Sequence, residues 1–427
     1  MDFINPPEQI QYELLHCVTL TYRSIQKSMN MERISRICQQ LSIEINNETY
    51  TPSTYTRFAV IDPKIREIYA PSFRDRLVQC WLVYHLSPAV ERVLIDDTFA
   101  NRKGKGTLAA ILKVQTSMRK PDNTYYLQLD IQNFFNSIEL SKLMGLCENI
   151  LNRYFNNHSL KTQLHHVLKQ CIFHAVATHT VTLSGDSELL SSIPEHKTLS
   201  AAPKGHGLPL GSAASQMFAN IYLSPLDHYI KHQLKVKGYV RYMDDLLLTG
   251  QSTQQLAQWK KDISVFVKQQ LSLNLHPKKQ TIQKCHQGAD YLGYKVYPHY
   301  LHLRKRNIQK LLSWLHFFNA KLEGKTNKPA HHIEYKYEWE HRFSTTNTFP
   351  FTPSYELLQQ IQAIINSYYG LMKHANHYRL RQLIYHKHFR LLKTYFLPSD
   401  AQYNSVHIKK YCLTTWMDQQ IESSSCL

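Results

Sequence analysis

The sequence predicts an α+β fold, in which long amphipathic helices are interspersed with short strands and hairpins. Helical spacing of apolar residues is clearest between Leu256 and Leu271, whereas β-formers dominate Thr124 to Ile131 and both sides of a turn within Tyr239 to Gly250. The chain has 427 residues, of which 43% are apolar. A chain of this length and composition can bury a large core, and we expect about two or three domains or subdomains.

The N-terminal part is expected to be helical and then to form a hairpin. The order of elements is a helix from Glu8 to about Asn30, a helix from Ile34 to Ile45, a strand-turn-strand from Thr51 to Tyr69 around Asp62-Pro63, and a helix from Pro71 to Ser87. Lys64 and Arg66 lie near the hairpin tip, where cations are usually just solvated, yet the same placement suits a triphosphate. The basic, Gly-punctuated loop Asn101 to Thr107 lacks the Gly-Lys-Ser/Thr ending of a P-loop, which argues against that mode of nucleotide binding.

The middle of the chain combines a strand that ends near an acid with a glycine-rich turn. Asp130 interrupts the β-formers close to the strand end, where it is either a turn or cap residue or a metal ligand, since a buried carboxylate is costly unless it is paired. A long helical stretch is expected from Leu140 to about Ala177, followed by a loop-rich segment from Thr180 to Pro203. The stretch GHGLPLGSAASQ then predicts a tight turn that opens a helix, and its small residues allow another chain to approach the backbone closely.

The C-terminal part mixes a few strands with more helix. The expected elements are a strand that bears Lys279, a hairpin around Gly293, a helix from Ile308 to Leu322, an exposed insertion at 324–352 and a helical region from Tyr355 to Tyr395. In that last region aromatic residues such as Tyr369 interleave with cations such as Arg381, a mixture that suits a nucleic-acid backbone, although helix packing explains some of them. From Leu397 the pattern weakens, with a hint of helix between Val406 and Gln419, and no internal repeat occurs.

The charge balance is strongly basic. Fifty Lys and Arg oppose 32 Asp and Glu, which gives a net charge of +18 spread along the chain rather than in one tail. A soluble basic protein would show this, but so would a broad binding surface for a phosphate backbone, which we favour. The 27 Tyr and 24 His add rings that suit stacking on unpaired bases.

Cysteine usage and the N-terminus indicate a cytoplasmic protein. The eight Cys show no C-x-x-C spacing, which argues against a zinc ribbon and against a dense disulfide framework, so free thiols are expected. The opening MDFINPPEQIQ has acids and prolines where a signal peptide needs basic and then apolar residues, and no apolar run reaches membrane-spanning length. We therefore expect no membrane association.

Asp244 and Asp245 lie at the tip of the hairpin within Tyr239 to Gly250. Asp is common in turns because its side chain bonds to nearby backbone, so this pair taken alone favours a turn over a metal site. A metal site needs a partner elsewhere in the chain, and Asp130 is a third carboxylate on a rigid strand. Carboxylates are the hard oxygen ligands that magnesium prefers.

The most specific feature is the order of motifs between Asp130 and Tyr294. An Asp at a strand end, a Gly-rich turn, a Tyr-x-Asp-Asp hairpin, a Lys-bearing strand and a Leu-Gly-Tyr turn follow one another, and this series resembles the palm of reverse transcriptases. With fingers and thumb the resemblance covers about Tyr55 to Gln382, and it implies a right-hand polymerase with fingers, a ferredoxin-like palm and a helical thumb. The implied domains are an N-terminal helical region (1–50), fingers (51–125), palm (126–171 and 206–295) with a fingers insertion or loop (172–205), thumb (296–396) and C-terminal tail (397–427).

The turn that runs from Leu210 to Gln216 indicates which group of reverse transcriptases the chain resembles most. Most reverse transcriptases have Gln before the glycine and Pro after the serine, whereas an aliphatic residue and Gln at these places are typical of diversity-generating retroelement enzymes. Those enzymes copy a template RNA with frequent errors at adenine, and the replaced Gln, here Leu210, is implicated in the low fidelity. The insertion at 324–352 and the tail from 397 make the chain longer than the compact members of this group. The alternative is therefore an antiphage defence reverse transcriptase that copies a dedicated noncoding RNA. A noncatalytic RNA-binding scaffold is a further alternative.

The resemblance assigns a role to each candidate residue. Asp130, Asp244 and the carbonyl of Ile131 would hold two Mg²⁺ ions, for which Mn²⁺ can substitute, and Asp245 would tune the site or bind a metal less directly. Lys64 and Arg66 would neutralise the incoming triphosphate, and Lys279 would protonate the leaving pyrophosphate. The other residues would contact nucleotide or primer: Phe135 would exclude a ribose 2′-hydroxyl, Leu210, Gly211 and Gln216 would adjoin the nucleotide, and Leu292, Gly293 and Tyr294 would grip the primer.

These roles together describe an RNA-directed DNA polymerase. Its expected partners are a template RNA, specifically a noncoding or retroelement RNA, its cDNA product and dNTPs. An accessory protein is a further candidate partner.

Overall fold

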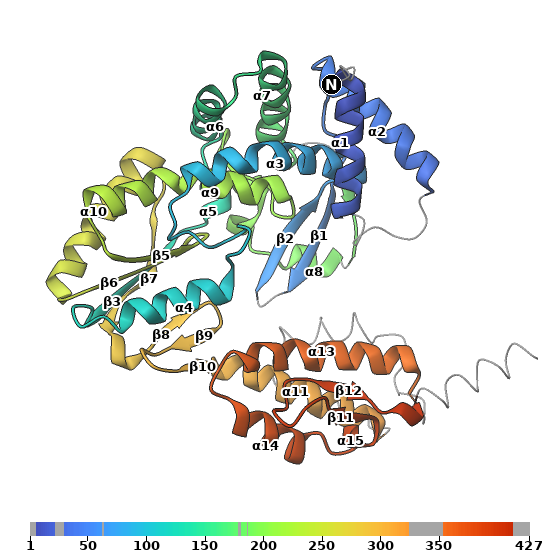
Figure 1. Ribbon diagram of the computed structural model, residues 1–427, viewed down its shortest axis with the longest axis vertical. Helices are drawn as coiled ribbons and strands as arrows, with labels where there is room; N and C mark the ends of the chain where they lie inside the picture. The colour runs from blue at the N-terminus through green and yellow to red at the C-terminus, as the bar shows by residue number, and fades with distance from the viewer. Residues whose placement is uncertain are drawn as a thin grey trace, which may run out of the picture. The chain divides into compact units, whose positions relative to one another are not determined.

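The computed structural model divides the chain into two compact units, Met1–Gln283 and Lys284–Leu427. The residues that it describes are 6–21, 30–61, 64–177, 181–185, 187–323 and 353–412. Both units combine helices with antiparallel sheets, so the predicted α+β class is confirmed (Figure 1).

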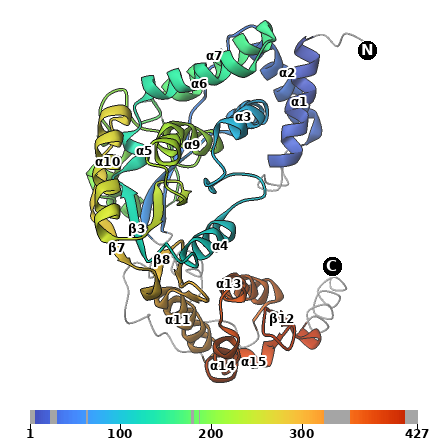
Figure 2. The same cartoon turned by 60° about the vertical axis from the view of Figure 1, so that its left-hand side comes forward.

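The sheet at the centre of the first unit has four strands in the order β5-β6-β3-β7. These strands are β3 (Tyr125–Ile131), β5 (Gly238–Tyr242), β6 (Asp245–Gly250) and β7 (Leu275–Lys284), with α9 (Ala213–His228) and a π-helical turn η4 (Tyr229–Gln233) before β5 and α10 (Thr253–Leu271) before β7. Along the chain the order is strand, helix, two strands, helix and strand. Together with the order of the strands in the sheet, this is the expected ferredoxin-like arrangement. Helix α10 packs on β3 and β6 (Figure 2), and it buries Ile263 in the same core as Leu129 and Leu246.

The N-terminal elements agree with the predicted order. They are α1 (Pro6–Thr21), α2 (Met31–Asn46), β1 (Thr56–Ile61), β2 (Ile65–Ala70), α3 (Phe73–Val93) and α4 (Thr107–Met118). Strands β1 and β2 pair from Thr56 with Ala70 to Ile61 with Ile65, which confirms the hairpin, and the turn residues Asp62 and Pro63 lie outside the described residues. Helix α3 runs beyond Ser87, with Pro88 inside it, and packs along α9 (Figure 1).

The helical stretch expected from Leu140 to about Ala177 consists of two helices. They are α6 (Leu140–Tyr154) and α7 (His158–Phe173). The chain is extended at Phe155, and Asn157 caps α7 by accepting the backbone N–H of Leu160 at 3.1 Å. The loop-rich stretch that follows holds only short elements, β4 (Thr182–Leu183), α8 (Ser187–Ser191), η2 (Glu195–Lys197) and η3 (Leu199–Ala201), and α5 (Phe134–Ser137) is a single turn after β3.

The second unit contains two small sheets and a group of helices. Its elements are η5 (Cys285–Gln287), β8 (Ala289–Tyr291), β9 (Tyr294–Val296), β10 (Leu301–Leu303), α11 (Lys305–Leu322), α13 (Tyr355–Lys373), α14 (Tyr378–His388), α15 (Leu392–Tyr395), β11 (Phe396–Pro398) and β12 (Val406–Ile408). The hairpin predicted around Gly293 is β8–β9. The helix suggested from Val406 is wrong at its start, because Val406–Ile408 pairs with β11, and residues from 413 onward, like the insertion at 324–352, lie outside the described residues.

Two of the residues expected to offer an aromatic and basic surface are part of the packing of the second unit. Tyr369 is fully buried, and Arg381 is 4% exposed. The Arg381 guanidinium donates to the carbonyls of Met372 and Gln402, both at 2.9 Å. These two side chains therefore join α13 and α14 to the β11–β12 loop and do not face a ligand.

None of the seven cysteines in the described ranges forms a disulfide. Among the helices of the described residues, none combines the length and the apolar character needed to cross a bilayer.

Candidate functional site

The candidate site is built around the turn of the β5–β6 hairpin. Tyr242 pairs with Asp245, so Met243 and Asp244 alone form the turn. Met243 has a positive φ of 54°, which two-residue hairpin turns require but which is uncommon for a side chain of this size. A non-glycine residue in this region costs about 1–3 kcal/mol, so the surrounding structure must hold it.

A buried arginine supplies that support. Arg241 Nη1 donates to the carbonyl of Met243 at 3.0 Å, and its Nε and Nη2 donate to the two carboxylate oxygens of Asp227 at 2.8 and 2.6 Å. Both side chains are fully buried. Tyr239 also donates to Asp227, and Asn220 accepts from Arg241. Asp227 and Asn220 both belong to α9. Because the guanidinium donates to them and to the turn, it ties the turn to this helix.

The register of the sheet brings the acids together. Asp130, the last residue but one of β3, lies directly opposite Asp245 on β6, and Asp244 is the next residue in the turn. Asp130 is 8% exposed, and Asp244 is half-buried. Burial raises the pKa of Asp244 and the neighbouring Asp130 carboxylate raises it further, while Lys279 and Arg66 lower it in part. The Asp130 carboxylate is therefore close enough to disfavour the charged form of Asp244.

Two predicted cations lie against these carboxylates. Lys279 on β7, the strand next to β3, places its Nζ 2.6 Å from Oδ2 of Asp130. Arg66 on β2 is close enough to Asp244 to lower the pKa of that carboxyl. Lys64, by contrast, is exposed just before β2. Paired acids that attract cations from two different elements have the electrostatics of a cation site.

The predicted glycine turn packs against β2. The backbone N–H of Tyr69 donates to the carbonyl of Leu210 at 2.7 Å. Gly211 has φ +112°, and a Cβ there would lie 2.8 Å from both the Tyr69 carbonyl oxygen and Cγ2 of Ile68. A small residue was expected here because it allows another segment to approach the backbone closely. At Gly211 that segment is β2. Leu210 is half-buried, and Gln216 is exposed in the first turn of α9.

Phe135 is connected to the same turn through the backbone. Ile131 ends β3, and the chain reverses through Asn133, whose φ is +46°. The carbonyl of Phe135 then accepts the N–H of Leu208 at 2.9 Å, two residues before Leu210. The ring of Phe135 meets the ring of Phe134 edge to face, with the centroids 5.5 Å apart, and packs against the core of the first unit. These contacts fix the position of the ring.

The structure thus brings together only part of the predicted set. Asp130, Asp244, Asp245, Lys279 and Arg66 meet at the hairpin, whereas Phe135, Leu210 and Gly211 are linked to it through β2 and β3, and Lys64 and Gln216 remain exposed. Leu292, Gly293 and Tyr294 belong to the other unit, where they form the β8–β9 turn and the Tyr294 hydroxyl donates to Leu371.

The sequence reading missed Arg241 and its partner Asp227. The signal was present, because a charged residue inside a strand of buried β-formers requires a buried partner. Nothing in the local pattern identifies that partner, which lies on α9.

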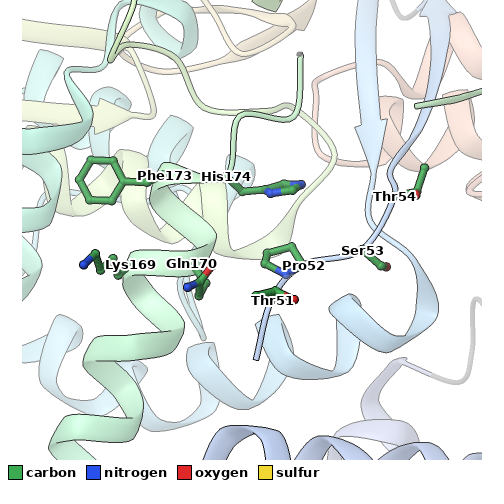
Figure 3. Close-up of a pocket in the computed structure, with 8 residues that line it drawn as sticks. All are labelled: Thr51, Pro52, Ser53, Thr54, Lys169, Gln170, Phe173 and His174. Atoms are coloured by element: carbon green, nitrogen blue, oxygen red, sulfur yellow. The ribbon is translucent and has the colours of Figure 1, made fainter. Parts of the chain in front are cut away.

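One cavity of the first unit is distinct from this site. A cavity of about 600 Å³ lies between residues 51–54 and the C-terminal end of α7, where the ring of His174 is directed towards Pro52 and Ser53 (Figure 3). None of the acids at the hairpin lines it. Among the described residues, moreover, no three His, Cys, Asp or Glu side chains are grouped so that they could hold a metal.

Comparison with known proteins identifies the family. The family described as "Reverse transcriptase (RNA-dependent DNA polymerase)" matches residues 61–296, more than half of the chain. The chain belongs to this family. The matched range of the reverse transcriptase family begins at the end of β1 and ends with β9, so it includes the hairpin, the acids and Lys279.

Individual reverse transcriptase relatives are distant. The group II intron-encoded protein LtrA of Lactococcus lactis subsp. cremoris, also from strain MG1363, is 22% identical over 330 residues, which cover 62% of this chain and 50% of LtrA. The chain therefore spans about half the length of the curated relatives that it matches.

Solved structures with a similar fold include telomerases. Apo telomerase from Candida tropicalis is 13% identical with a TM-score of 0.41, and the likeness covers 78% of this chain and 60% of that one. Telomerase from Candida albicans, solved with a fragment of telomeric RNA, is also 13% identical with a TM-score of 0.38, covering 80% and 58%. A likeness of this degree says nothing about what the present chain binds.

Proposed function

We propose that this chain is an RNA-directed DNA polymerase that copies a template RNA into cDNA from dNTPs. The observation that carries the proposal is the placement of Asp130 beside Asp244, with Lys279 and Arg66 against them, in a chain of the reverse transcriptase family. Nucleotidyl transfer asks a protein mainly to position the primer hydroxyl and to stabilise the charge on the phosphates.

Polymerases of this family generally use divalent metals, and the donor set here fits such ions. Two acidic side chains are held close together although burial and mutual repulsion oppose it, and Lys279 is the cation that neutralises one of them. Asp130, Asp244 and the carbonyl of Ile131 would hold Mg²⁺ or Mn²⁺, with Asp245 in a less direct role. When bound, a pair of such ions stabilises the attacking and leaving oxygens as a Lewis acid.

The cations of the chain act on the triphosphate. Arg66 would bind its outer oxygens from β2, with the exposed Lys64 near it in the chain, and it is already close enough to lower the pKa of Asp244. Lys279 would transfer a proton to the leaving pyrophosphate, because its ammonium lies at the edge of the same carboxylates and is about half exposed.

The central test compares Asp244→Asn with Asp122→Asn, which removes an exposed acid in the turn before β3. Purified protein with an RNA template, a DNA primer, Mg²⁺ and dNTPs should extend the primer. Asp244→Asn should abolish extension because it removes a ligand charge at constant size, whereas Asp122→Asn should extend normally. Unchanged synthesis in Asp244→Asn would refute the proposal, and absence of synthesis in wild type would favour the scaffold alternative.

We also propose that copying is error-prone and serves sequence diversification, which rests on Leu210. Its carbonyl binds β2, so the residue adjoins the strand that carries Arg66. Leu210→Gln should reduce misincorporation opposite template adenine in sequenced cDNA, and equal error rates would contradict this role. The RNA that copurifies distinguishes a variable-repeat template from a short defence RNA.

A further inference from the structure

The exposed face of the β8–β9–β10 sheet in the second unit carries polar and aromatic side chains. Residues alternate between the two faces of a strand. On the inner face Tyr291, Tyr294 and Leu303 form one buried row. On the outer face Asp290, Lys295 and His302 lie opposite one another across the three strands, and His302 is exposed.

Four rings follow one another in contact on this face, two pairs of them stacked, and we call them the ring ladder: Tyr297, Tyr300, His302 and His377. Tyr297 and Tyr300 are stacked with centroids 4.4 Å apart, Tyr300 lies 5.0 Å from His302, and His302 stacks on His377 at 5.3 Å. Offset stacking at these separations is favourable. The ladder is therefore an ordered arrangement of rings.

The backbone holds the ladder in place at both ends. A Cβ on Gly288 would lie 2.8 to 2.9 Å from three carbons of the Tyr297 ring, so the face of this ring rests on a position where only glycine leaves space. At the other end, Nε2 of His377 accepts the N–H of Leu303 at 2.8 Å, which requires a neutral imidazole at that nitrogen. Burial lowers the pKa of His377, and His302 and Arg381 lower it further, in keeping with this bond.

The rings of the ladder are partly exposed to solvent, unlike rings in a protein core. Tyr300 is 41% exposed, and its stacking partner Tyr297 is half-buried. Rings fixed in advance and open to solvent lose little freedom when another flat ring stacks on them. A stack of this kind can therefore be extended by a ligand.

The surroundings are cationic. Between Lys284 and Glu323 the sequence has seven Lys or Arg and two acidic residues. Lys295 places its Nζ 5.8 Å from the centre of the Tyr297 ring, while Lys305 and Arg306 are exposed in the first turn of α11. One of the two acids, Asp290, is paired with Arg304 at 3.4 Å. Flat rings between cations favour a ligand that alternates bases with phosphates.

We propose that the ring ladder is a stacking platform for unpaired bases of the RNA that this chain binds, with Tyr300 as its outermost ring. The occupant is unpaired, because a duplex hides the faces of its bases. It is RNA, because in the proposed reaction the cDNA is paired with its template while uncopied template is single-stranded. The inference rests on the proposed function for the identity of the strand. It is separate from the predicted primer contact, since Leu292 and Gly293 lie at the other end of β9.

The test measures binding of the full chain to a fluorescein-labelled single-stranded RNA and to a blunt RNA duplex, by fluorescence anisotropy. Tyr300→Ala should weaken single-strand binding about 5- to 150-fold, the loss of one base stack, and leave duplex binding unchanged. Tyr300→Phe keeps the ring and should bind within about twofold of wild type. A melting curve by circular dichroism checks that both variants fold.

Three results would overturn the platform. They are wild-type affinity in Tyr300→Ala, an equal loss in Tyr300→Phe, and a loss confined to single-stranded DNA of the same sequence. Primer extension on a short template with only a few unpaired nucleotides beyond the primer separates this inference from the proposed function. Tyr300→Ala should extend that template normally. If the wild-type protein makes no cDNA but the Tyr300→Ala variant binds single-stranded RNA more weakly than wild type, the polymerase proposal fails and the platform remains.

Discussion

Replacement of Arg241 by Met should destabilise the first unit and slow the proposed DNA synthesis about 100-fold. The substitution leaves the Asp227 carboxylate buried without its bidentate partner, and it leaves the Met243 carbonyl without its donor. Both side chains of the pair are fully buried, so water cannot compensate. Breaking such a pair costs about 3–5 kcal/mol, against a total stability of about 5–15 kcal/mol.

The expected size of the effect follows from these energies. For a unit of this length each kcal/mol shifts the melting temperature by about 2–4 °C, so Arg241→Met should melt about 6–20 °C below wild type. The turn that carries Asp244 also loses the hydrogen bond that holds Met243 at positive φ. A displacement of about 1 Å at a reacting group costs about 100-fold in rate, and we expect kcat to fall by that order with little change in the KM for dNTP.

A second variant separates charge compensation from positioning. Adding Asp227→Asn to Arg241→Met removes the unpaired charge and keeps an acceptor for the Tyr239 hydroxyl. Much of the lost stability should return, but kcat should stay low, because the Met243 carbonyl still has no donor. Melting is followed by circular dichroism at neutral pH, and kcat by primer extension under saturating dNTP.

Two outcomes would refute this reasoning. If the double variant recovers kcat together with its melting temperature, Arg241 only neutralises Asp227 and does not position the turn. If Arg241→Met melts like wild type, the pair is not a stabilising element, and the buried contacts described for it have no energetic weight.

Three further predictions concern other positions. Gly211→Ala should cost about 1–3 kcal/mol in urea denaturation, because it strains φ and meets the backbone of β2, whereas Gly145→Ala, in an open helical position, should gain about 0.4–1 kcal/mol. Burial lowers the pKa of His377, so the unfolded chain binds more protons and stability should be lost as pH falls below 6.5; His377→Gln keeps an acceptor for Leu303 and should remove this dependence in melting curves. Phe135→Ala should raise incorporation of NTP relative to dNTP in primer extension, and an unchanged ratio would exclude it as the sugar-discriminating ring.

Features that depend on neighbours in the sequence were predicted well. The β5–β6 hairpin follows from alternating β-formers around two acids, and the structure confirms both strands and the turn. The pairing of Asp130 with Asp245 is not local, because the order of strands in the sheet decides which residues lie opposite each other. The sequence therefore predicted that the acids would meet, but not that Asp244 would lie in the turn and Asp245 in the strand.

Errors arose where a distant contact or a short cap decides the structure. The helical stretch from Leu140 was predicted without its internal boundary, which the extended residue Phe155 and the cap at Asn157 define. Strand β12 is too short for a visible alternation, and its pairing with β11 defines it. Arg241 was passed over for the same reason, since its role depends on Asp227, which a helix brings to it from elsewhere in the chain.

One strand, β2, connects the two halves of the candidate site. It carries Arg66, which acts on Asp244, and three residues later Tyr69, whose N–H holds the carbonyl of Leu210. The absence of a side chain at Gly211 sets the distance between this strand and the turn. A shift of β2 must therefore move together the cation proposed to bind the triphosphate and the residue proposed to govern fidelity. A substitution that loosens this contact is expected to change both rate and nucleotide selection.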